Sequence, residues 1–210
     1  MNSNAIEIVV REISTDNAAL CSLLSEEECA YASQLSDARR REWVAWRATL
    51  RSQAERWALG DSALRVAYAP SGKPLFEGLE GSISVTHSRR YVALARAWEG
   101  RCGIDTEQLN RNYERIEDKF ISSTEKELAT AHDERFRAAV WCAKEAAYKC
   151  LGQSGVDFRC DLQVTEVDFE GGRVRGKALG KEFEGVLHEL DGAILVAVTT
   201  NPDPHFTFEK

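Results

Sequence analysis

The chain has 210 residues, a length at which folding buries about 70% of the unfolded surface and forms a core without disulfides or structural metals. Hydrophobic residues make up 43% and charged residues 29% of the sequence, a balance that excludes disordered and collagen-like classes. The formal net charge of −7 provides no overall attraction for nucleic acid or an anionic membrane. An anionic ligand would therefore need a local cluster of basic side chains.

The sequence lacks the patterns of a signal peptide or a membrane span. Glu7, Arg11 and Glu12 interrupt the apolar residues near the start, and the longest clearly apolar run, Ala193 to Val198, is too short to cross a bilayer. The six cysteines form no C-x-x-C pair and lie far from the four histidines. We expect reduced thiols, no zinc site and a cytoplasmic location.

The first half is predicted to contain a strand, a helical region and further strands. Ser25 and Glu28 have the spacing of a capping box, and helix-forming residues continue to Leu59, so one long helix or a broken pair is expected. Four large residues recur at helical spacing and predict a buried stripe: Trp43, Trp46, Leu50 and Trp57. Three arginines form a basic stripe on another side: Arg40, Arg47 and Arg51.

A loop rich in proline and glycine is predicted at residues 69–74, and it carries Lys73. Two segments of strand composition follow, Tyr91 to Trp98 and Cys102 to Thr106. Because only a short Glu-Gly turn separates them, they predict a β-hairpin.

The second half repeats the order of helices before strands. Thr124 and Glu127 predict a second capping box, from which two helices continue to Leu151. Four strand-like segments then alternate with turns: 162–169, 173–178, 183–190 and 193–200. The fold class predicted is therefore α+β, with two similar α+β lobes at residues 1–103 and 104–210 that share an interface.

Two acidic residues stand close together at a predicted strand end. Asp105 and Glu107 are two residues apart, so their carboxylates project to the same side of the strand. Crowded carboxylates need a neutralising cation, and oxygen ligands suit Mg²⁺, which commonly binds phosphate oxygens as well. The alternative for an isolated pair of this kind is a solvated strand end.

A second group of polar residues lies on a predicted helix. Trp141, Glu145 and Lys149 are spaced by four residues and share one side of that helix. Glu145 could hold a metal while Lys149 neutralises a phosphate or a developing oxyanion. The alternative is an exposed intrahelical ion pair, worth only about 0.3 to 0.5 kcal/mol.

The remaining candidates are a histidine and several basic residues. His87 lies among hydroxyl residues after a strand-like start, although a lone histidine is more often structural or exposed. Lys73, Arg40, Arg47 and Arg51 could bind a phosphate group. A solvated helix face explains the arginines equally well.

The order of these motifs narrows the interpretation. A basic helix, Gly-Lys-Pro74, His87-Ser, Gly103-Ile-Asp-x-Glu107 and Trp141-x-x-Lys-Glu-x-x-x-Lys149 follow one another along the chain. In this order they resemble the Sfp-type 4'-phosphopantetheinyl transferases, which convert apo carrier proteins to their holo forms. The resemblance covers essentially the whole chain.

The resemblance implies a pseudo-twofold arrangement of the two lobes. Coenzyme A would bind in the cleft between them, with contributions from lobe 1–103, while lobe 104–210 would carry the metal and catalytic residues. The implied Mg²⁺ ligands are Asp105, Glu107 and Glu145, and the implied catalytic residues are Glu145 and Lys149. The residues implied to bind coenzyme A are Arg40, Arg47, Lys73 and His87.

The implied activity is Mg²⁺-dependent transfer of 4'-phosphopantetheine from coenzyme A to a serine of an apo acyl or peptidyl carrier protein, which releases 3',5'-ADP. Carrier proteins are commonly acidic, so Arg111, Arg115 and Lys119 are either docking residues or an ordinary solvated face. Two internal lobes make a monomer sufficient, and no nucleic acid or membrane partner is expected.

Two other functions remain as alternatives. One is a non-catalytic module of the same fold that binds coenzyme A or a carrier protein. The other is a nucleic-acid-binding protein that uses the helix arginines, which the acidic charge balance disfavours.

Overall fold

The computed structural model describes residues 4–13, 18–69, 74–129 and 133–209. The elements in chain order are β1 (Ala5–Glu12), α1 (Ala18–Cys21), α2 (Glu26–Ser33), α3 (Asp37–Ser52), α4 (Asp61–Leu64), β2 (Ala67–Tyr68), β3 (Pro74–Leu75), β4 (Ser82–His87), β5 (Tyr91–Ala97), β6 (Cys102–Gln108), η1 (Glu114–Ile116), α5 (Glu117–Phe120), α6 (Ser123–Lys126), α7 (Glu134–Leu151), β7 (Leu162–Asp168), β8 (Arg173–Ala178), β9 (Lys181–Leu190), β10 (Ala193–Thr199) and β11 (His205–Glu209). Within these ranges, no helix has both the length and the apolar character that a membrane span requires.

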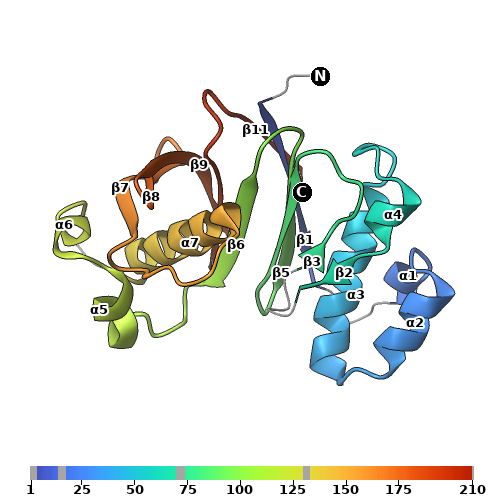
Figure 1. The fold of residues 1–210 in the computed structure, drawn as a ribbon. Helices are drawn as coiled ribbons and strands as arrows, with labels where there is room; N and C mark the ends of the chain where they lie inside the picture. Colours follow the sequence, from blue (N-terminus) through green and yellow to red (C-terminus); the bar gives the residue numbers. More distant parts are fainter. Residues whose placement is uncertain (1–3, 14–17, 70–73, 130–132, 210) are drawn as a thin grey trace.

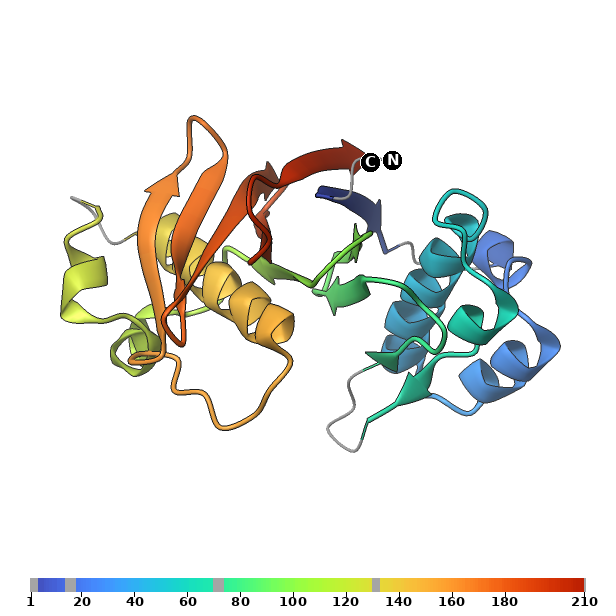
Figure 2. The same cartoon turned by 45° about the horizontal axis from the view of Figure 1, so that its top comes forward.

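The fold is of the predicted α+β class and is built around two main sheets (Figure 1). One sheet has the strand order β11-β1-β5-β4, and the other has the order β6-β10-β9-β8-β7. The sheets lie side by side in the middle of the molecule, with α3 outside the first and α7 outside the second (Figures 1 and 2). Apolar residues of β1, β5, β6 and β10 pack between them, among them Ile8, Ala95, Ile104 and Leu195.

The end of the chain returns to the first sheet. β11 pairs in parallel with β1, and Ile6 lies opposite Phe206 (Figure 2). The expected division at residues 103 and 104 places β11 in the C-terminal lobe, whereas its hydrogen bonds join it to a strand of the N-terminal lobe. The pseudo-twofold relation of the lobes stays a prediction.

The predicted helical region of the first lobe is a broken pair, α2 followed by α3. Ser25 and Glu28 form the predicted capping box at the start of α2. The predicted buried stripe is confirmed, since all four of its side chains are 9% exposed or less: Trp43, Trp46, Leu50 and Trp57. Trp57 lies beyond the end of α3, so it reaches this core from the following turn.

The second capping box was predicted at the wrong residues. Ser122 and Glu125 form it, rather than Thr124 and Glu127. Glu125 is 1% exposed, and its carboxylate also accepts hydrogen bonds from the buried Lys144 ammonium at 2.8 Å and from the Val164 N–H at 2.8 Å. These buried donors favour a capping box at Ser122 and Glu125, because this position buries the Glu125 carboxylate beside them.

The predicted hairpin of residues 91–98 and 102–106 is also wrong. β5 pairs with β1 and β4, whereas β6 belongs to the other sheet and pairs with β10. The turn between them therefore carries the chain from one sheet to the other. Sequence spacing alone does not distinguish this crossing from a hairpin, because both need the same short turn.

Side-chain hydroxyls join the two sheets where β4 meets β6. The hydroxyl oxygens of Ser82, Ser84 and Thr86 accept hydrogen bonds from the backbone N–H groups of Cys102, Ile104 and Thr106, at 2.9, 3.1 and 3.3 Å. We call this row of contacts the hydroxyl ladder. It satisfies buried donors of β6 that have no paired strand on that side.

Helix α7 lies directly against β6 because Gly103 has no side chain. A Cβ atom at this position would lie 1.8 Å from the carbonyl oxygen of Ala146. The glycine of the Gly-Ile-Asp motif is therefore required for the close approach of the strand and the helix that carry the candidate site.

We predict that Gly103→Ala lowers the free energy of unfolding by about 3 kcal/mol, because the strand and α7 must move apart. Urea denaturation measures the change. Gly60→Ala is the matched control, since a Cβ there meets nothing within 4 Å and the φ angle is −73°. An equal, small effect of both substitutions would contradict this role of Gly103.

Candidate functional site

Asp105 lies on β6 next to the hydroxyl ladder and is 6% exposed. Its Oδ1 atom accepts hydrogen bonds from the Lys149 ammonium at 2.8 Å and from the Thr86 hydroxyl at 3.1 Å. Its Oδ2 atom is buried and, among the described residues, has no hydrogen-bond partner. A buried carboxylate oxygen without a partner is costly, so this atom is suited to a further cation or donor.

Glu107 lies two residues further along β6 on the same side, as predicted. Its Oε1 atom accepts hydrogen bonds from the Arg111 guanidinium and from the Trp141 indole N–H, the latter at 3.1 Å. Burial and then the charge of Asp105 raise the pKa of Glu107, while Arg111 and Trp141 oppose this shift. Trp141 itself is held by ring contacts with Phe120 and Phe158.

Helix α7 presents Trp141, Glu145 and Lys149 to β6, as their spacing predicted. Glu145 is partly buried, and burial followed by the charges of Asp105 and Glu107 raises its pKa, although Lys149 opposes the shift. The structure therefore brings together three carboxylates and one ammonium from β6 and α7. In the sequence, the residues of one element lie 38 to 44 positions from those of the other.

The carboxylates fit a hard divalent cation in their chemistry. Within the described part of the chain, no three His, Cys, Asp or Glu residues form a preassembled metal cluster. Three observations still favour a cation: the orphaned Oδ2 of Asp105, the raised pKa values of Glu107 and Glu145, and a donor set made only of oxygen. The assignment of Asp105, Glu107 and Glu145 as Mg²⁺ ligands stays a prediction.

His87 lies at the end of β4 beside the same group of charges. Its Nδ1 atom is 3.7 Å from Oε2 of Glu42 on α3. Partial burial lowers the pKa of His87, and the positive charges of Arg39 and Lys149 lower it further. The negative charges of Glu42 and Asp105 oppose this shift. Arg39 is exposed, and the sequence suggested it only among the helix arginines of the nucleic-acid alternative. Its position three residues before Glu42 places both on one side of the helix.

The other predicted basic residues lie elsewhere. Arg40 donates to the carbonyl oxygens of Ala32 and Leu35, both at 3.0 Å, and Arg47 is 3% exposed and pairs with Glu28. The structure does not bring either arginine to the carboxylates. Lys73 lies outside the described residues.

Of the three candidates for carrier docking, only Arg111 contacts the group of carboxylates, through Glu107. Arg115 and Lys119 are exposed on η1 and α5. Their proposed contact with a partner protein stays a prediction.

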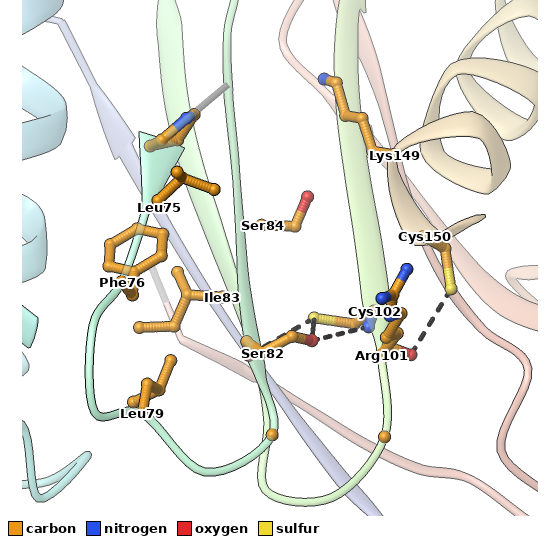
Figure 3. A pocket seen from close by; sticks show the side chains of 13 residues that line it. Leu75, Phe76, Leu79, Ser82, Ile83, Ser84, Arg101, Cys102, Lys149 and Cys150 are labelled. Carbon is orange, nitrogen blue, oxygen red and sulfur yellow. Dashed lines mark hydrogen bonds between the residues drawn. The ribbon is translucent and has the colours of Figure 1, made fainter. Parts of the chain in front are cut away.

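A pocket of about 370 Å³ adjoins Lys149 (Figure 3). Figure 3 shows apolar side chains of β3, β4 and the segment between them on one side and Cys102, Lys149 and Cys150 on the other. The apolar lining residues are Pro74, Leu75, Phe76, Leu79 and Ile83. A ligand in this pocket would have one apolar wall and would end at the ammonium of Lys149.

Comparison with known proteins points to one family. Residues 101–198, which run from the residue before β6 to the penultimate residue of β10, match the family model of the 4'-phosphopantetheinyl transferase superfamily. No curated protein matches the chain. The matched segment contains Asp105, Glu107, Glu145 and Lys149.

We predict that Glu145→Gln makes the metal-free protein more stable than the wild type at pH 7.5. The pKa of Glu145 is raised in the folded state, so ionising this carboxyl opposes folding, and its contribution to stability is lost as pH rises through the folded pKa. The gain should shrink as pH falls to 4.5, where much of the carboxyl is protonated in either state.

Urea denaturation in EDTA at several pH values measures this difference. Glu99→Gln, at an exposed carboxyl in the turn after β5, is the control and should show no such dependence. A pH-independent effect of Glu145→Gln would refute the raised pKa of Glu145 in the folded protein.

Proposed function

We propose that the protein transfers 4'-phosphopantetheine from coenzyme A to a serine of an apo acyl or peptidyl carrier protein. The observation that carries this proposal is the convergence of Asp105, Glu107, Glu145 and Lys149 within the segment that matches the transferase superfamily. The serine oxygen forms a bond to the β-phosphorus of coenzyme A. The bond from that phosphorus to the bridging oxygen breaks, and 3',5'-ADP leaves.

The reaction places negative charge on an already anionic pyrophosphate. When held by Asp105, Glu107 and Glu145, Mg²⁺ supplies positive charge to this group. Thr86 and Lys149 hold Asp105 through its Oδ1 atom, which leaves Oδ2 available. The hydroxyl ladder thus orients one of the three carboxylates before any ligand binds.

Lys149 stabilises the leaving side. Its ammonium has three N–H groups, and two of them bind the Ile104 carbonyl at 3.0 Å and Asp105 at 2.8 Å. The third is available for a phosphate oxygen of a ligand in the adjoining pocket. Because the first two contacts fix the ammonium, it needs little reorganisation as charge develops.

Glu145 accepts the proton of the attacking serine. In the metal-free protein, burial and then the neighbouring carboxylates raise its pKa, and a bound cation would oppose this shift. Its role as the base therefore rests on its position among the carboxylates on α7. A carboxylate has two oxygen atoms, so one can bind a cation while the other takes the proton.

His87 and Arg39 bind the 3'-phosphate of coenzyme A. The charges of Arg39, Lys149 and Asp105 all act on His87. Arg39 is exposed, whereas the neighbouring Arg40 donates to backbone carbonyls at the end of α2 and beyond. Lys73, which directly precedes the pocket residue Pro74 in the sequence, remains proposed for the same anion.

We predict that the transfer reaction is observed by intact-mass spectrometry. An apo carrier protein incubated with this protein, coenzyme A and Mg²⁺ should gain one phosphopantetheinyl group, and omission of the metal should abolish the gain. Glu145→Gln should lower kcat by at least about 100-fold, since it removes a base. Glu99→Gln is the control and should retain activity.

Two outcomes would oppose this function. Normal turnover by Glu145→Gln would refute the role of Glu145. Measurable binding of coenzyme A with no mass gain on carriers from fatty-acid, polyketide and nonribosomal-peptide synthesis would favour the non-catalytic binding module.

Adjacent arginines test the assignment of the phosphate site. We predict that Arg39→Gln raises the KM for coenzyme A by about tenfold, the cost of one charge-assisted contact, and has little effect with a substrate that lacks the 3'-phosphate. Arg40→Gln removes the same charge one residue away and should change KM little. The sequence-based assignment of Arg40 predicts the opposite order.

A further inference from the structure

Arg111 is held at the edge of the carboxylate group by contacts with three side chains. Its guanidinium donates to Oε1 of Glu107 and lies over the Trp141 ring at 5.4 Å and the Tyr113 ring at 5.8 Å. Tyr113 is fully buried, and its hydroxyl donates to the carbonyl oxygen of Gln108 at 3.1 Å, which ties the loop back to β6. The arginine is therefore placed by the fold, although its side chain is 46% exposed.

The charge of Arg111 acts on more than its direct partner. Its positive charge interacts with Asp105 and Glu145 as well as with Glu107. Lys149 neutralises Asp105 from the side of α7. Arg111 is a second cation in contact with the group, through Glu107.

Two partners already occupy the Oε1 atom of Glu107. The Trp141 indole is fixed between Phe120 and Phe158, whereas Arg111 is half-exposed and has space to turn into solvent. A divalent cation among these carboxylates would also lie close to the guanidinium, and like charges at contact distance repel strongly. Of the two partners, Arg111 is therefore the one free to move when a cation binds.

We propose that Arg111 is a tethered counter-ion, which neutralises Glu107 in the metal-free protein and is displaced when a divalent cation binds. The inference rests on the proposed function, since it assumes that Asp105, Glu107 and Glu145 hold the metal. Displacement of the guanidinium costs free energy and so weakens metal binding. It also releases a basic side chain beside the site at the moment when the site becomes loaded.

Titration of the full chain with Mn²⁺, followed by electron paramagnetic resonance of the free ion, tests the proposal without measuring activity. Arg111→Gln should bind Mn²⁺ about five- to tenfold more tightly than the wild type. Arg115→Gln is the matched control, because it removes the same charge from an exposed position four residues away. It should change the affinity by less than about twofold.

Repeating the Mn²⁺ titrations at high ionic strength distinguishes displacement of Arg111 from a long-range electrostatic effect of its charge. Salt at about 0.5 M screens charges that lie more than a few ångströms apart, so a long-range effect of Arg111 should fall to that of Arg115. Displacement of a direct contact should keep Arg111→Gln clearly tighter than Arg115→Gln. Thermal unfolding gives a second readout: Arg111→Gln should be less stable than the wild type in EDTA and should gain more stability from Mn²⁺.

The outcomes distinguish the counter-ion role of Arg111 from the metal site of the proposed function. Equal Mn²⁺ affinity of Arg111→Gln and Arg115→Gln, with binding that Asp105→Asn abolishes, would overturn the counter-ion role and leave the metal site intact. No Mn²⁺ binding by the wild type or by Arg111→Gln would overturn both. Binding by Arg111→Gln alone would support the tethered counter-ion in its strongest form.

Discussion

The hydroxyl ladder between β4 and β6 is the contact on which the arrangement of the site depends. Both strands are edges of their sheets, and side-chain hydroxyls replace the backbone carbonyls that a paired strand would provide. Thr86 acts twice, since it accepts from the Thr106 N–H and donates to Asp105. The ladder thereby places His87, at the end of one sheet, beside the carboxylates at the edge of the other.

The site concentrates charge at a cost to stability. Burial and mutual repulsion raise the pKa values of Glu107 and Glu145, and Lys149 and Arg111 only partly offset the repulsion. Packing alone would not favour this arrangement of charges. Unfavourable electrostatic interactions and shifted pKa values of this kind are typical of sites that bind or react with a ligand. The same charges make the site receptive to a cation and give Arg111 its proposed role.

Local patterns predicted most of the elements and part of the site. The spacing of Glu145 and Lys149 placed both on one side of α7, and alternation placed Asp105 and Glu107 on one side of β6. The hairpin was wrong because a short turn does not specify whether two strands stay in one sheet. Arg40 and Arg47 were selected on charge, but their directions depend on α2, whose carbonyl groups and Glu28 bind them.

The sequence by itself determined the α+β class, the helical and strand faces, and the group of residues that resembles a transferase. These features depend on contacts within a few positions of one another, where periodicity is informative. Only the tertiary structure decided that β11 returns to β1, that the charge of Arg39 acts on His87 while Arg40 turns to backbone carbonyls, and that Arg111 contacts Glu107. Those contacts join distant segments, or depend on the direction of one side chain in a helix or loop, and no local pattern specifies either.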